Sequence, residues 1–131
     1  SATLVAGGAL APAVAMVVTT PPEEMQELLW HEAYGNAAVA TALSKRLHAN
    51  LLAAVRGAGH ASIAMPTLAT GGQGLDPACV CNGLAMALAD DARAHPGEPL
   101  LLRVACFERA HLAHAHAAKA RVLECLFDVS A

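Results

Sequence analysis

The order of apolar and polar positions along the chain predicts helices that alternate with short strands. The clearest helical period falls within residues 37–56, where apolar residues recur at every fourth position: Val39, Leu43, Leu47, Leu51 and Val55. Polar residues lie between them: Lys45, Arg46, His48 and Asn50. This spacing is typical of an amphipathic helix. Gly57 and Gly59 are expected to end it.

Short continuous apolar runs predict the strands. A strand followed by a glycine turn is expected within residues 1–11, and a second strand within 12–20. Residues 61–66 and 100–106 have the same character, with Arg103 as the exception. The run within 12–20, which is continuously apolar, fits a central strand that is buried on both faces of a sheet.

Further helices are expected between and after these strands. One begins after Pro21-Pro22 and runs to about residue 34, and two more cover residues 77–95 and 108–127. Their inward positions are predicted to be Val80, Leu84 and Leu88 in the first of these two, and Leu112, Ala115, Val122, Leu123 and Leu126 in the second. Strands that alternate with helices predict one α/β domain over residues 1–131, with a mostly parallel sheet flanked by helices.

A glycine loop joins the 61–66 strand to the helix that follows. Gly71, Gly72 and Gly74 allow positive φ or a close approach of a ligand to the main chain. Asp76-Pro77 is a helix-start signal, with a carboxylate at the N-cap and proline at the first helical position. A glycine loop at a helix N-terminus can hold an anion, and it can equally be a simple turn. It is neither a P-loop nor the dinucleotide-binding G-x-G-x-x-G motif.

Composition narrows the classes of partner. Apolar residues make up 56% of the 131 residues, and the formal net charge is -3 with no basic run. Nucleic acid is therefore not expected as a partner. No segment reaches the ~18 uninterrupted apolar residues that a membrane-spanning helix requires, so no membrane association is expected.

The four cysteines contain no C-x-x-C pair; they are Cys79, Cys81, Cys106 and Cys125. We interpret them as free, buried thiols in a reducing intracellular compartment, either the cytoplasm or an organelle. Cys106 lies at the carboxyl end of a strand, near the expected ligand crevice. Buried strand thiols are usually inert, so no catalytic residue is assigned.

Histidines and aromatic residues gather on two predicted helices. His111 and His114 share a helix face and His116 is turned away from it. A zinc site would need a third ligand from elsewhere, so we interpret this segment as a solvated, histidine-rich helix without a metal. Trp30 and Tyr34 lie one helical turn apart, and they are either core residues or a contact surface for a partner.

The order of these motifs resembles the macro domain family. Residues 62–66 (Ser-Ile-Ala-Met-Pro) and 69–74 (Ala-Thr-Gly-Gly-Gln-Gly) are similar to the family's S-I-A-F-P-x-x-S/T-x-G-[VI]-[YF]-G segment. Residues 2–10 resemble its A-x-x-T-x-G-x-x-L strand and turn, and residues 14–21 its I-I-H-x-V-G-P strand. Residues 100–108 resemble the late strand that ends in C/V-F-D/E. The resemblance implies a three-layer, macro-like fold truncated at its N-terminus.

Several family features have no counterpart in this sequence. The first strands are missing, together with the Asp for the adenine and the V-N-A-A-N and G-G-G-V segments, so ADP-ribosyl hydrolysis is not expected. Valines and threonines replace the histidine of the I-I-H-x-V-G-P segment. Gln73 stands where an aromatic ring usually lies against the distal ribose.

The resemblance also implies a set of ligand-binding residues. Thr70, Gly71, Gly72 and Gly74 match the loop whose N–H groups hold the ADP-ribose diphosphate, with Gln73 in the ribose slot. Phe107 matches the aromatic residue that packs on the adenine. The alternatives are a tight turn for the glycines and an ordinary core position for Phe107.

Two functions follow from the resemblance. The first is binding of ADP-ribose or a related nucleotide diphosphate, without catalysis and without a cofactor. The second is a degenerate macro-like domain that serves as a structural or interaction subunit in a larger assembly. The missing strands would leave an open sheet edge, which invites pairing with a protein partner or a second copy.

Overall fold

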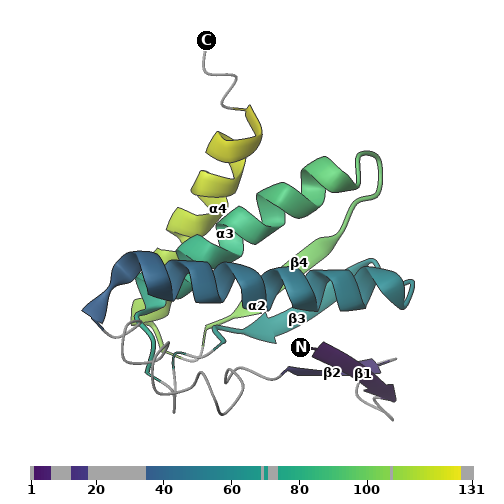
Figure 1. Ribbon diagram of the computed structural model, residues 1–131, viewed down its shortest axis with the longest axis horizontal. Helices are drawn as coiled ribbons and strands as arrows, with labels where there is room; N and C mark the ends of the chain where they lie inside the picture. The colour runs from purple at the N-terminus through teal and green to yellow at the C-terminus, as the bar shows by residue number, and fades with distance from the viewer. Residues whose placement is uncertain are drawn as a thin grey trace.

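The computed structural model describes residues 2–6, 13–17, 35–68, 70, 74–106 and 108–127. In chain order the elements are β1 (Ala2–Ala6), β2 (Ala13–Val17), α2 (Ala37–Gly57), β3 (Ser62–Pro66), α3 (Pro77–Ala94), β4 (Leu101–Ala105) and α4 (Ala110–Phe127) (Figure 1). Strands and helices within these ranges confirm the α/β class and the segments predicted there. The helix expected before residue 35 lies outside the described residues.

Local signals in the sequence define both ends of α2. The Asn36 side chain accepts hydrogen bonds from the backbone N–H groups of Ala38 at 3.0 Å and Val39 at 3.4 Å. This N-cap satisfies donors that have no partner inside the helix. At the other end, Gly59 takes φ 82° and its N–H donates to the Arg56 carbonyl. The helix therefore stops where the glycines predict.

The start of α3 also follows the predicted signal. The Asp76 side chain accepts from the Ala78 N–H at 3.0 Å, and Pro77 occupies the first helical position. Proline is tolerated there because its missing N–H would have no partner inside the helix. The helix ends before Pro96-Gly97, and Gly97 has φ 78°. The chain then returns through β4.

The strands form two separate two-stranded sheets. β3 and β4 are parallel, with Ser62 opposite Leu101 and Pro66 opposite Ala105. β1 and β2 are antiparallel, with Ala2 opposite Val17. Parallel strands require a long crossover, which α3 provides, whereas strands that are close in sequence pair antiparallel. Only the coarse α/β class is therefore seen among the described residues, without the continuous, mostly parallel sheet that the sequence suggested.

The β3–β4 sheet is buried on one face only. Met65 is buried against Leu51 and Val55 of α2 and Leu84 of α3. The opposite face consists of exposed residues: Ser62, Ala64, Pro66, Leu101, Arg103 and Ala105. The prediction of a buried strand at 61–66 therefore holds for one face of β3 only, because small residues at its outward positions made an alternating pattern look like a continuous apolar run.

Helices α2 and α3 cross at a very close contact. A Cβ atom placed on Gly83 of α3 would lie 2.6 Å from the Lys45 backbone nitrogen and 2.6 Å from Ser44 Cβ. Glycine is thus the residue that permits this approach. Around it, Ala40, Leu75, Cys79 and Val80 form one apolar cluster, and Cys81, Ala85 and Ala118 form another that reaches α4.

Polar side chains are buried in the same contact. Ser44 Oγ donates to the Val80 carbonyl at 2.6 Å, and His48 Nδ1 lies 2.7 Å from the Ser44 carbonyl. His48 is only 1% exposed, although the sequence pattern placed it with the polar residues. That placement is wrong because the close approach of α3 at Gly83 covers this side of α2.

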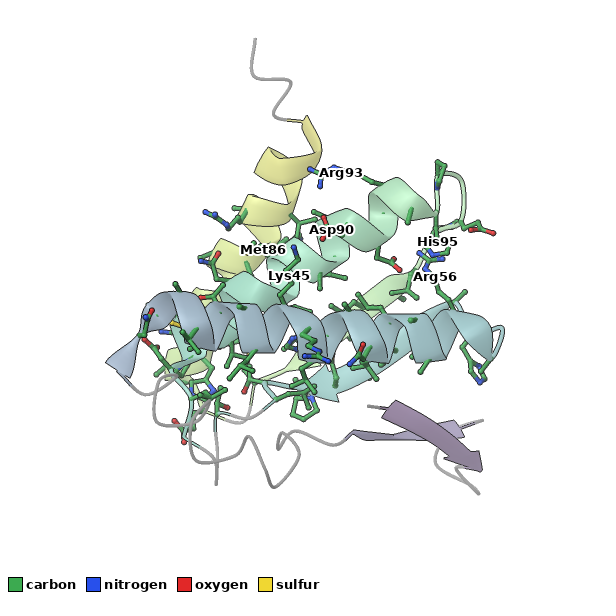
Figure 2. All side chains as sticks on the ribbon, viewed as in Figure 1. Lys45, Arg56, Met86, Asp90, Arg93 and His95 are labelled. Atoms are coloured by element: carbon green, nitrogen blue, oxygen red, sulfur yellow. The ribbon has the colours of Figure 1, made fainter. Side chains whose placement is uncertain are left out.

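Two ion pairs link the same helices further along. Arg56 donates from Nε to Asp91 Oδ1 and from Nη2 to Asp91 Oδ2, both at 2.8 Å, and the pair is largely buried. The hydrogen bonds to Asp91 raise the pKa of Arg56 above its already high usual value. Lys45 and Asp90 form a more exposed pair at 3.1 Å (Figure 2). Together these contacts hold α2 against α3 along most of its length.

Candidate functional site

The parallel arrangement of β3 and β4 brings two polar segments to one edge of their sheet. Both strands end at this edge, which is where α/β proteins bind their ligands. The chain after β3 carries Thr67 and Thr70, and the chain after β4 carries Glu108 and then α4. Thr67, Thr70 and His111 form a connected set of hydrogen bonds at this edge, and Glu108 lies close to His111.

The two threonines form the first part of this chain. Thr70 Oγ1 donates to the Thr67 carbonyl at 2.8 Å, and the two hydroxyl oxygens are 3.1 Å apart. A threonine hydroxyl that bonds to the backbone three residues away stabilises a turn. Both side chains are half-buried, so their hydroxyl groups are held in place at the end of β3.

His111 of α4 extends the chain across the site. Its Nδ1 lies 3.0 Å from Thr67 Oγ1, and its Nε2 lies 3.4 Å from Glu108 Oε2. The imidazole is only 7% exposed, whereas the Glu108 side chain is largely exposed. The result is a threonine hydroxyl, an imidazole and a carboxylate in series, which we call the Thr67–His111–Glu108 chain.

The tautomer of His111 determines what this chain can do. With its proton on Nε2, the ring donates toward Glu108, and Nδ1 accepts the Thr67 hydroxyl proton. With Nδ1 protonated, the ring donates to Thr67, whose own proton is then free for Thr70 or for a bound acceptor. With Nδ1 protonated, the arrangement can therefore offer the Thr67 hydroxyl as a donor to an oxygen-rich group, while the imidazole holds that hydroxyl in place.

The N-terminus of α3 borders the same edge. Gly74 takes φ 67°, which directs the chain into the helix, and Leu75 is buried in the core behind it. Asp76 already occupies the helix N-terminus with its carboxylate, which also accepts from Cys79 Sγ at 3.9 Å. An anion would therefore have to bind the loop itself, because Asp76 adds a negative charge and uses one of the free helix N–H groups.

The predicted ligand residues are only partly within the described region. Thr70 and Gly74 lie at the edge just described, Thr70 in the turn and Gly74 at the entry to α3. Gly71, Gly72, Gln73 and Phe107 lie outside the described residues.

The prediction that the histidine-rich helix is solvated is wrong for His111, which is buried against Thr67. His116 is exposed and His114 is half-buried. Among the described residues, no group of three or more His, Cys, Asp or Glu side chains could hold a metal ion. Leu112, which was predicted to face inward, is 44% exposed.

The described cysteines are free thiols. Cys79 and Cys81 are buried, as predicted, and Cys106 is half-buried. Burial raises the pKa of the Cys81 thiol, and Cys106 contributes to the same shift. A raised pKa disfavours the thiolate, which is the nucleophilic form. The side chain of Cys125 lies outside the described region.

Sequence reasoning missed Thr67 and Glu108. The spacing of Glu108 and His111, three residues apart at the start of a helix, was the available signal. No local signal in the sequence marked Thr67, because it is 44 residues away from His111.

Comparison with known proteins gave no relative: no protein-family model, no curated protein and no solved structure matches this chain. In the part of the chain that the structure describes, no helix is long and apolar enough to cross a membrane.

Proposed function

We propose that this chain binds ADP-ribose or a related nucleotide diphosphate at the carboxyl edge of β3 and β4. The observation that carries the proposal is the Thr67–His111–Glu108 chain, which holds the Thr67 and Thr70 hydroxyl groups at the start of the glycine segment 70–74. Phosphate and ribose oxygens are the groups that such donors recognise. The positive φ of Gly74 supports a loop with backbone N–H groups available to the diphosphate.

The proposal assigns binding without catalysis. Thr67 and His111 satisfy one another, and Glu108 is largely exposed. These residues orient a ligand in the proposed function and do not attack it. Phe107 is proposed to stack on the base, as the macro-domain resemblance implies.

Titration calorimetry with ADP-ribose, and with AMP as the control ligand, tests this function. We expect micromolar affinity for ADP-ribose and weaker binding of AMP. Gly72→Glu should abolish binding, because it fills the loop and adds a charge that repels the diphosphate. Gly57→Glu is the matched control, because Gly57 is exposed with no atom near its Cβ position, so it adds the same charge elsewhere. Equal binding by both variants would refute the loop assignment.

A second function rests on the unpaired strands. The described strands form two-stranded sheets, and a sheet of two strands is only marginally stable by itself. A structural or interaction subunit would complete them with strands from a protein partner or a second copy. Sedimentation velocity distinguishes the cases: a folded chain that remains a compact monomer and binds ADP-ribose would contradict this second function.

A further inference from the structure

An apolar groove lies beside β4, outside the ligand edge. It has a volume of about 830 Å³ and is bounded by β4, α3, α4 and the loop before β4. Its apolar walls include Leu84, Leu88, Leu102, Val104, Leu112 and Ala115. We call this feature the β4 groove.

Exposed leucines border the β4 groove. Leu101 is 53% exposed and Leu112 is 44% exposed, and both line the groove. Among the described residues these are the exposed large hydrophobic side chains. An exposed leucine at the rim of an apolar groove is a feature that interaction sites share.

The backbone of β4 presents unpaired hydrogen-bonding groups along this groove. The Leu101 N–H donates toward β3, to the Ala61 carbonyl at 2.9 Å. Because backbone groups alternate sides along a strand, the N–H and C=O groups of Leu102 and Val104 point away from β3. Within the described residues β4 pairs with β3 alone, so this edge is open.

The formal charges of the groove are separated in space, with the exposed Glu98 in the loop before β4 and Lys119 on the α4 wall. On the side of α3, Arg56 is paired with Asp91, and His95 lies 3.0 Å from Glu98. On α4, exposed Lys119 and His116 line the groove, and Lys119 has no ion pair within the described part of the chain. An occupant with acidic side chains would complement this wall.

We propose that the β4 groove takes an extended acidic segment of another protein, which adds to the sheet as a strand at the free edge of β4. Backbone hydrogen bonds to Leu102 and Val104 would set its register, and alternate apolar side chains would enter the groove. Its acidic residues would lie near Lys119. This inference rests on the interaction-subunit function and names its partner, and the observations behind it are separate from those behind the nucleotide site.

The test uses the full 131-residue chain and a synthetic peptide that alternates valine and glutamate. In fluorescence anisotropy the glutamate peptide should bind about tenfold more tightly than its lysine counterpart. Lys119→Glu should weaken binding of the glutamate peptide by about tenfold. Arg46→Glu, at an exposed position of α2 outside the groove, is the matched control and should leave it unchanged. Equal binding of both peptides would contradict the proposal that the partner segment is acidic.

Two modified peptides test strand addition itself. N-methyl groups are placed on the valines in one peptide and on the glutamates in the other. Only one set of N–H groups faces β4 in an added strand, so one modification should abolish binding and the other should not. If both modified peptides bind like the parent, the groove holds its occupant through apolar contacts alone and the proposal fails.

Amide exchange locates the bound peptide and separates this proposal from the ligand site. Exchange of the Leu102 and Val104 amides should slow on binding, while the Leu101 and Arg103 amides, which face β3, serve as controls. If exchange of these amides slows as the protein concentration rises in the absence of peptide, the groove is occupied by a second copy of the chain. That result would contradict the proposal of a strand from another protein. ADP-ribose titration of Lys119→Glu reports the nucleotide site separately, so either function can fail alone.

Discussion

The two sides of α3 differ in how completely they are packed. On the α2 side, Gly83 brings the backbones together, and Ser44, His48 and the Arg56–Asp91 pair are buried in the contact. On the α4 side, Ala85 and Ala118 touch, and beyond them the β4 groove remains open. The α2 side of α3 is therefore a fully packed core, whereas the α4 side leaves an apolar groove in which a partner segment could bind.

The largest expected effect is at Gly83. Gly83→Ala should destabilise the fold by about 2–3 kcal/mol, because the new Cβ meets the backbone of Lys45, which cannot rotate away. Gly57→Ala is the control, since nothing lies within 4 Å of its Cβ position. Urea unfolding followed by circular dichroism measures both. Equal stability of the two variants would contradict the close crossing of α2 and α3.

A smaller loss is expected at Thr67. Thr67→Val keeps the shape but removes the hydroxyl that bonds to His111, and it should cost about 1–2 kcal/mol because the imidazole is buried. Thr67→Ser keeps the hydroxyl and should recover most of this loss. The same urea titrations serve as the readout. If serine and valine behave alike, the hydroxyl is not what links β3 to α4.

His48 should make stability depend on pH. Burial lowers the pKa of His48, and the hydrogen bond to the Ser44 carbonyl offsets part of this shift. Within the described residues its Nε2 has no hydrogen-bond partner. The unfolded chain, with a histidine pKa of about 6.5, therefore binds a proton more readily than the folded chain does. The contribution of His48 is fully present above pH 6.5 and is lost as the pH falls below it.

Urea unfolding at pH 7.5 and at pH 5.5 measures this effect. The native chain should lose stability at the lower pH, and His48→Gln should lose less. His116→Gln is the control because His116 is exposed, and it should keep the pH dependence of the native chain. An identical pH dependence in all three proteins would mean that His48 is not buried in its neutral form.

The smallest expected effect is at Leu112. Leu112→Ala should change the free energy of unfolding by no more than about 0.5 kcal/mol, as for other surface positions. Leu84→Ala, on the buried side of the same groove, should cost about 2 kcal/mol. A large loss at Leu112 would mean that the α4 side is packed more tightly in solution than the open groove implies.

Helices and their ends were largely predictable because their signals are local. Asp76-Pro77 and Gly59 act on neighbouring backbone groups, so the sequence contains both partners of each interaction. The apolar run of 61–66 likewise marked β3. Which side chains of each element are buried was less predictable. Leu112 fits a helical apolar stripe, yet its side chain is 44% exposed.

The candidate site was less accessible to sequence reasoning than the fold. Thr70 and Gly74 could be proposed from the glycine loop and its resemblance to the macro domain family. The contact of Thr67 with His111 depends on the crossing of two distant elements, and no local spacing encodes it. His48 was misplaced for the same reason: its burial is a property of α3 rather than of its own helix.

Helix α4 is shared between two surfaces. Its first turn holds His111 at the carboxyl edge of β3 and β4, and the following turns carry Leu112, Ala115 and Lys119 along the β4 groove. A ligand that shifted His111 would therefore tilt one wall of the groove. Thermodynamic linkage then requires reciprocity: if the nucleotide changes the affinity of the groove for its occupant by some factor, the occupant changes the affinity for the nucleotide by the same factor. A movement of α4 would then couple the two binding equilibria.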